Sequence, residues 1–255
     1  MKKTKVILFT SHGINANLVY SFLVKKYTVI GVVFDSPGSK KKMIQRRIKR
    51  LGFFKVLLQL LFMKGVVPLL NLEGKKRKNE ILSGFNLNLI NGIPNSFFPK
   101  SINDPEVIKY VNKLAPDVIM VSGTRLIQKK IIEAIKAPLL NMHVGITPKY
   151  RGVHGGYWAL VNKDLKHCGV TVHFIDPGID TGGVISQKTI VPTRKDNYAT
   201  YPMLQIIKGL ECIEEAISEI ETNQLTVKQN GLSSKLYYHP TITSYLYHRI
   251  VNGVK

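Results

Sequence analysis

The stretch LLNMHVGITPKYRGVHGG, residues 139–156, ends a short apolar run with an amide and an imidazole, Asn141 and His143. Side chains of a β-strand alternate between its two faces, so residues two apart are expected on the same face. The proline and glycines that follow oppose a helix. The stretch therefore predicts a buried strand whose end presents both side chains to one site.

Apolar segments that alternate with helical segments extend in both directions from this strand. Strands are expected at residues 6–9, 28–34, 88–90, 116–123, 168–176 and 182–192. A turn at residues 11–17 is expected to lead into a helix that ends near residue 26, and further helices are expected at residues 104–114, 128–136 and about 201–220. Apolar strands that alternate with helices are typical of a parallel sheet. The predicted fold class is α/β, with a Rossmann-like, mostly parallel sheet flanked by helices.

Composition limits the class of protein. The 255 residues are 44% hydrophobic, which suits one large α/β domain. The 37 Lys and Arg exceed the 16 Asp and Glu, giving a net charge of +21 that favours acidic partners such as polyglutamates, nucleotides, RNA or an anionic membrane face. A Lys-rich solvated surface explains the charge equally well. Two cysteines, Cys168 and Cys212, lack metal-ligand spacing, so a reducing cytoplasm and no metal site are expected.

The N-terminal segment lacks the patterns of a signal peptide and of a dinucleotide-binding site. Its apolar run is too short for a signal peptide, and no uninterrupted apolar stretch has the length expected of a transmembrane helix. The turn after the first strand reads SHGIN, with one glycine where a dinucleotide site needs several. Nicotinamide or flavin binding is therefore not expected.

Residues 38–80 interrupt the α/β pattern. A basic block, GSKKKMIQRRIKR, precedes the apolar segment LGFFKVLLQLLFMKGVVPLL, and EGKKRKNE follows. On a helix, Lys55 and Gln59 would form one narrow polar stripe. We expect the apolar surface to be covered by the sheet, by a second subunit in a homodimer, or by an anionic membrane surface that binds residues 40–64.

A second polar loop, DPGIDTGG, follows the strand at residues 168–176 and supplies Asp176 and Asp180. Ligands of parallel α/β sheets collect at the carboxyl ends of strands. There, an amide and a protonated imidazole can stabilise an oxyanion, and a carboxylate can keep the imidazole charged. The combination indicates acyl transfer, although the spacing of an Asn-x-His pair alone is weak support.

Two motifs in this order, NMHVGITPKYRG and GVTVHFIDPGIDTGG, resemble the formyltransferases that use 10-formyltetrahydrofolate. The layout resembles the amino-sugar N-formyltransferases most. The resemblance covers residues 4–35 and 88–192 and implies the formyltransferase fold. It divides the chain into a catalytic domain at 1–192, with an insertion at 38–80, and a C-terminal helical extension at 193–255 that is not an OB barrel.

The resemblance also assigns residues. It implies Asn141, His143 and Asp180 as the catalytic set, with no metal. The folate-binding residues that it implies are Arg125, Leu126, Ile127, Ile175, Asp176 and Gly178. The candidates for binding the acceptor are His12, Asn15, Tyr150, Arg151 and His154. For Arg151 and His154, a structural role is an alternative to binding the acceptor. His173 is interpreted as a hydrogen-bonded support, and Trp158 is interpreted as part of the core.

The resemblance implies an N-formyltransferase that moves a formyl group to a primary amine. The reduced glycine loop in SHGIN counts against glycinamide ribonucleotide, and the roughly thirty residues after the last long helix are too few for the barrel of tRNA enzymes. The expected acceptor is a nucleotide-linked amino sugar for surface polysaccharide, without nucleic acid, in the cytoplasm or at the inner membrane face. The alternatives are a methionyl-tRNA or glycinamide ribonucleotide formyltransferase, or a non-catalytic membrane-surface scaffold with this fold.

Overall fold

A computed structural model describes residues 3–84, 93–228 and 231–255. Within them, a seven-stranded sheet has the order β3-β2-β1-β4-β5-β7-β8. Its parallel strands are β1 (Lys5–Thr10), β2 (Thr28–Phe34), β3 (Ser96–Phe97), β4 (Val118–Ser122) and β5 (Leu139–His143). Antiparallel pairing joins β7 (Gly169–Phe174) to β5 and β8 (Val184–Thr189) to β7. The predicted mostly parallel α/β sheet is confirmed; the strand expected at 88–90 lies outside the described residues.

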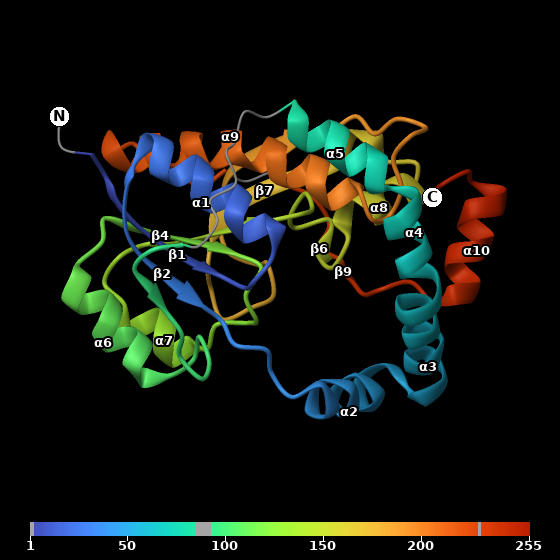
Figure 1. Cartoon of the computed structure of the whole chain (residues 1–255), viewed down its shortest axis with the longest axis horizontal. Coiled ribbons are helices and arrows are strands. Elements are labelled where there is room, and N and C mark those ends of the chain that lie inside the picture. Colours follow the sequence, from blue (N-terminus) through green and yellow to red (C-terminus); the bar gives the residue numbers. More distant parts are fainter. Residues whose placement is uncertain (1–2, 85–92, 229–230) are drawn as a thin grey trace.

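Helices cover both faces of the sheet (Figure 1). Alternate residues of β1 divide between two cores: Val6 and Leu8 pack with α1 (Ile14–Lys26) and α9 (Tyr201–Glu221). Ile7 and Phe9 pack with α6 (Pro105–Leu114) and α7 (Lys129–Ala134). Strands buried on both faces explain the continuous apolar runs in the sequence.

Helix α9 packs into the core of the sheet domain. Ile206, Leu210 and Ile213 of α9 belong to the same core as β1 and α1, so no change of packing follows residue 192. Beyond α9, β9 (Leu236–Tyr237) pairs in parallel with β6 (Arg151–Gly152), beside the loop that follows β5. α10 (Ile242–Val251) packs against the insertion. The remaining short helices are α8 (Gly155–Val161) and the 3-10 turn η2 (Leu165–His167).

The insertion folds into a helical arm beside the sheet domain (Figure 1). It comprises α2 (Lys40–Leu51), α3 (Phe53–Leu61), the π-helical turn η1 (Phe62–Val66), α4 (Val67–Glu73) and α5 (Lys75–Ser83). The span Phe53–Glu73, which Lys55 and Lys64 interrupt, has a mean hydropathy of 1.8 and, by length and composition, could cross a membrane. Only 22% of its most apolar window is buried, so the sheet does not cover this segment.

The expected stripe of Lys55 and Gln59 is also wrong. Lys55 is exposed, whereas Gln59 is buried and its Nε2 donates to the carbonyl of His239 at 2.6 Å. Phe62 anchors the same inner side, with its ring 5.0 Å from that of Tyr198 and 4.9 Å from that of Tyr245. The surface that this helix turns toward α10 and the C-terminal segment therefore contains both polar and apolar side chains.

We predict that Phe62→Ala lowers the free energy of unfolding by about 3–5 kcal/mol, because it removes a buried aromatic side chain from this contact. Phe54→Ala, at a side chain 78% exposed, should change it by less than about 0.5 kcal/mol. Urea denaturation followed by circular dichroism measures both. Equal effects of the two substitutions would contradict the packing described for the arm.

Candidate active site

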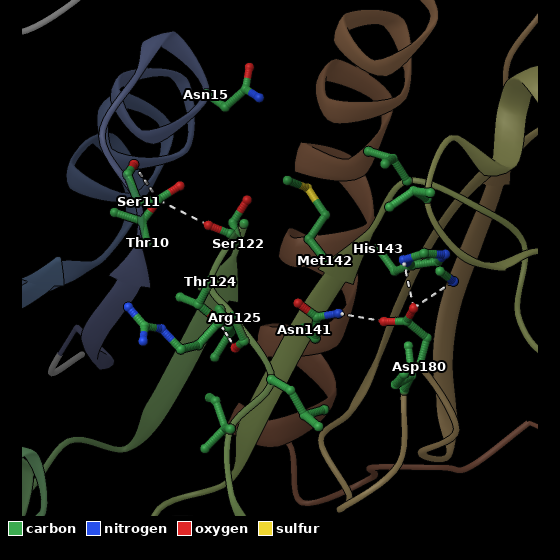
Figure 2. Close-up of a pocket in the computed structure, with 18 of the residues that line it drawn as sticks. Thr10, Ser11, Asn15, Ser122, Thr124, Arg125, Asn141, Met142, His143 and Asp180 are labelled. Carbon is green, nitrogen blue, oxygen red and sulfur yellow. Dashed lines mark hydrogen bonds and ion pairs between the residues drawn. The ribbon is translucent and has the colours of Figure 1, made fainter. Parts of the chain in front are cut away.

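A pocket of about 910 Å³ opens where the carboxyl ends of β1, β4 and β5 meet (Figure 2). Parallel strands bring their carboxyl ends to one edge of the sheet, where loops can form a site. Thr10, Ser122 and His143 are the last residues of these strands, and all three line the pocket. The pocket is large enough for a ligand of cofactor size.

Asn141, His143 and Asp180 lie together at this edge (Figure 2). His143 Nδ1 is 3.4 Å from Asp180 Oδ2, and Asn141 Nδ2 is 3.4 Å from Asp180 Oδ1. The first two side chains share a face of β5, and Asp180 reaches them from the loop after β7. The main-chain N–H of Gly152 donates to Asp180 Oδ2 at 2.9 Å. The structure thus brings together the three residues predicted to be catalytic.

His143 is neutral near pH 7. Its imidazole is 5% exposed, and burial lowers its pKa below 6.5, although Asp180 and the carbonyl of Tyr150 oppose the shift. Nε2 lies 2.8 Å from the Tyr150 carbonyl, which can only accept, so Nε2 carries the proton. The unprotonated Nδ1 faces Asp180. The expectation that the carboxylate keeps this imidazole charged is therefore wrong, because burial has the larger effect.

Asp180 is ionised. Burial acts to raise its pKa, but His143, the His173 side chain and the Gly152 N–H together lower it to about 2. Its φ of +52° is a left-handed conformation, which Asp tolerates better than most residues. This backbone turn points the carboxylate back toward β5.

His173 sets the orientation of the Asn141 amide. Its Nδ1 is 2.6 Å from the carbonyl of Phe174 and must carry the proton, so Nε2 accepts from Asn141 Nδ2 at 3.2 Å. The Asn141 nitrogen therefore points toward His173 and Asp180, and its oxygen points away from Asp180 (Figure 2). The second amide hydrogen donates to Asp180 Oδ1 at 3.4 Å, which is long for a hydrogen bond.

The residues expected to bind folate, together called the folate wall, all line the pocket: Arg125, Leu126, Ile127, Ile175, Asp176 and Gly178. Arg125 is held by Asp35, because its main-chain N–H and its Nε both donate to Asp35 Oδ2 at 2.9 Å. Asp35 is buried and also accepts from the main chain of Ile102, so it fixes the loop. Asp176 accepts from Gly178 N–H and Thr181 Oγ1 and shapes the opposite turn.

The five acceptor candidates separate into two groups. His12 and Asn15 line the pocket. Tyr150 is instead buried, with its hydroxyl donating to Asp164 at 2.9 Å, and Arg151 donates to the carbonyl of Ile179 at 2.9 Å. His154 stacks on Tyr198 with ring centroids 3.9 Å apart. The structure does not bring Tyr150, Arg151 and His154 to the pocket, and their contacts hold the loop.

Sequence reasoning missed several pocket residues. Met43 comes from α2, and Leu236, Tyr237 and Tyr238 come from the C-terminal segment, which lay outside the resemblance. In the sequence, the tail stands out by its concentration of tyrosines. Asp35 stands out as an acidic residue directly after an apolar strand. No local pattern marked Met43.

The chain matches known proteins in sequence and in structure. Residues 71–202 match the family model described as formyl transferase. Methionyl-tRNA formyltransferase of Thermodesulfovibrio yellowstonii is 33% identical over 145 residues, which are 56% of this chain and 46% of that protein. This chain spans about half the length of the relatives that it matches in sequence.

Solved structures share the fold. A sugar N-formyltransferase from Shewanella sp FDAARGOS_354 superposes with a TM-score of 0.57 at 10% identity, covering 92% of this chain and 76% of that one. An N-formyltransferase from Helicobacter canadensis in complex with folinic acid and dTDP-3-aminofucose gives 0.53 at 19% identity, covering 93% and 71%. At these identities the likeness concerns the fold.

We predict that Asp180→Asn lowers the pKa of His143 further, because the carboxylate is the charge that opposes burial. The imidazole resonances of His143, followed by NMR during a pH titration, measure this pKa. Asp176→Asn is the matched control, since Asp176 contacts Gly178 and Thr181 and not His143. A His143 pKa that stays unchanged or rises in Asp180→Asn would contradict the electrostatics described for the site.

Proposed function

This chain belongs to the formyl transferase family, and we propose that it moves a formyl group from 10-formyltetrahydrofolate to a primary amine. The observation that carries the proposal is the ionised Asp180 beside a neutral His143 and the Asn141 amide, at the edge of a pocket of cofactor size. Formyl transfer needs a hydrogen-bond donor that stabilises the oxyanion and a base that accepts the proton lost by the amine. The three side chains supply both.

Each residue has a role in this proposal. The N–H of Asn141 that donates to Asp180 over 3.4 Å would turn to the oxygen of the formyl group, which becomes negative when the amine nitrogen attacks the formyl carbon. His143 Nδ1 and Asp180 Oδ2, 3.4 Å apart, accept the proton from the amine and return it to N10 of the folate as the bond between the formyl carbon and N10 breaks. The neutral state of His143 favours this role, because a charged imidazole could not accept a proton. The carbonyl of Tyr150 holds the imidazole in place through Nε2.

The folate wall suits a flat heterocycle. Leu126 and Ile175 offer apolar side chains, and Leu126 is 52% exposed. The Arg125 side chain is held by Asp35, so it stabilises the wall and does not itself meet the pterin. Main-chain groups of the loops at residues 125–127 and 175–178 would then recognise the edge of the pterin.

We propose a nucleotide-linked amino sugar as the acceptor. The N-terminus of α1 lies at the pocket through His12, Gly13 and Asn15, with no side-chain cap and no acidic residue in its first turn. Free main-chain N–H groups at a helix N-terminus favour a phosphate. Tyr237 and Tyr238 line the same pocket and offer aromatic faces for a sugar or base. Soluble nucleotide sugars and folates imply a cytoplasmic site of action.

A methionyl-tRNA acceptor is the second candidate. The sequence match to methionyl-tRNA formyltransferases and the net charge of +21 favour it. Phosphate contacts of tRNA would use that charge, and their contribution falls steeply with salt.

We predict that a nucleotide-linked amino sugar has the highest kcat/KM in a panel that also contains glycinamide ribonucleotide and methionyl-tRNA. The physical reason is that a phosphate at the α1 N-terminus would fix the amine near Asn141. Transfer of a ¹³C-formyl group, followed by NMR, measures each rate. Preferential formylation of methionyl-tRNA would establish the second candidate in its place.

Asn141→Ala should reduce kcat by about 10²–10³, since it removes one oxyanion donor. Binding of 5-formyltetrahydrofolate, measured by calorimetry, should persist because the folate wall is unchanged. Asn112→Ala is the control: this α6 residue donates to the carbonyl of Ala134, away from the pocket. Near wild-type turnover in Asn141→Ala would remove Asn141 from the chemistry.

A further inference from the structure

The exposed side of the arm carries several large apolar side chains. Along Phe53–Glu73, the buried positions include the polar Gln59 together with Val56, Phe62 and Leu70. The outward positions include Phe54 at 78% exposure, Leu69 at 66% and Leu72 at 72%. A helix on the surface of a water-soluble domain normally keeps its large apolar residues inward, whereas this one exposes several of them beside Lys55, Lys64, Asn71 and Glu73. Contiguous apolar surface of this kind marks a contact with a partner or a membrane.

The helix beside this surface is strongly basic. Seven of the twelve residues of α2 are Lys or Arg, none is acidic, and none is buried. α2 packs against α3 and meets one end of it (Figure 1). α10, which also packs on α3, exposes further apolar side chains, among them Ile250 at 79%. Basic and apolar surfaces are therefore adjacent on the arm.

We propose that this docking face, the basic residues of α2 together with the exposed apolar residues of α3 and α4, binds the surface of an anionic phospholipid bilayer. The Lys and Arg side chains of α2 would contact anionic headgroups, and Phe54, Leu69 and Leu72 would enter the boundary between headgroups and acyl chains. This combination of cationic and aromatic or leucine side chains is typical of interfacial helices.

Charge disfavours a second copy of the chain as the occupant. The described insertion has two acidic residues, and both are already paired. Glu73 lies 3.5 Å from Arg249 and 3.8 Å from Lys255, and Glu80 lies 3.4 Å from Arg77. A symmetric dimer through this face would add basic helices to a chain of net charge +21 without an acidic counterpart.

The docking face adjoins the pocket. Met43 lies on α2 and lines the pocket together with His12 and Tyr238. Arg50, also on α2, lies 5.4 Å from the ring centroid of Tyr238. A bilayer bound by α2 would therefore hold the pocket close to the membrane surface.

Vesicle flotation with the full chain tests the proposal. The probes are vesicles of phosphatidylcholine alone and of phosphatidylcholine with phosphatidylglycerol, at low and high salt. The wild-type protein should float with the anionic vesicles, and less at high salt, because surface charges are screened. Absence of flotation with anionic vesicles at low salt would overturn the proposal.

Two triple substitutions separate the charged and apolar contributions. The change Lys41→Gln, Lys42→Gln and Arg46→Gln should weaken binding about 100-fold, at about 1 kcal/mol for each basic residue. The change Phe54→Ser, Leu69→Ser and Leu72→Ser should weaken it at least about 10-fold, since apolar burial in the interface is lost. All six side chains are exposed, so circular dichroism and thermal unfolding should match those of the wild type.

Matched controls use residues elsewhere on the surface. Lys109→Gln, Lys130→Gln and Lys136→Gln remove the same charge from exposed positions on or beside α6 and α7. Leu165→Ser with Val191→Ser removes apolar side chains that are 63% and 85% exposed. Both controls should bind as the wild type does. Equal loss in the controls would show nonspecific adsorption. A dimer in light scattering that Phe54→Ser, Leu69→Ser and Leu72→Ser dissociates, without vesicle binding, would show that a second copy covers the face.

Discussion

The carboxylate of Asp180 joins three segments that are distant in the chain. It faces His143 and Asn141 at the end of β5, and it accepts the main-chain N–H of Gly152. Gly152 lies in β6, which pairs with β9 of the C-terminal segment. One carboxylate thus ties the central sheet, the loop after β5 and the loop after β7 into a single site.

The pKa of Asp180 links this interaction to the stability of the fold. Because the pKa of Asp180 falls from 3.8 to about 2 on folding, the ionised carboxylate stabilises the folded state. Because the folded-state pKa is depressed, this contribution is fully present above the unfolded value and is lost as the pH falls from about 4 through about 2. The same fixed negative charge makes the neutral His143 a better proton acceptor, so stability and chemistry depend on one group.

The residue pattern of single segments was sufficient to predict the sheet and part of the site. The apolar run at 28–34 predicts β2 with its observed ends, and alternation places Asn141 and His143 on one face. Pattern could not reveal contacts set by the tertiary fold. Gln59 is buried because the carbonyl of His239, 180 residues away, accepts its amide hydrogen. His143 is neutral because of burial, and a sequence shows the neighbouring acid but not the absence of water.

The location of the formyl donor tests the account most directly. A crystal structure of the protein with 5-formyltetrahydrofolate would show it. The account predicts the pterin along Leu126 and Ile127, with the formyl group next to the Asn141 amide and the pair formed by His143 and Asp180. A pterin bound against residues 11–17, with the Asn141 amide untouched, would contradict it.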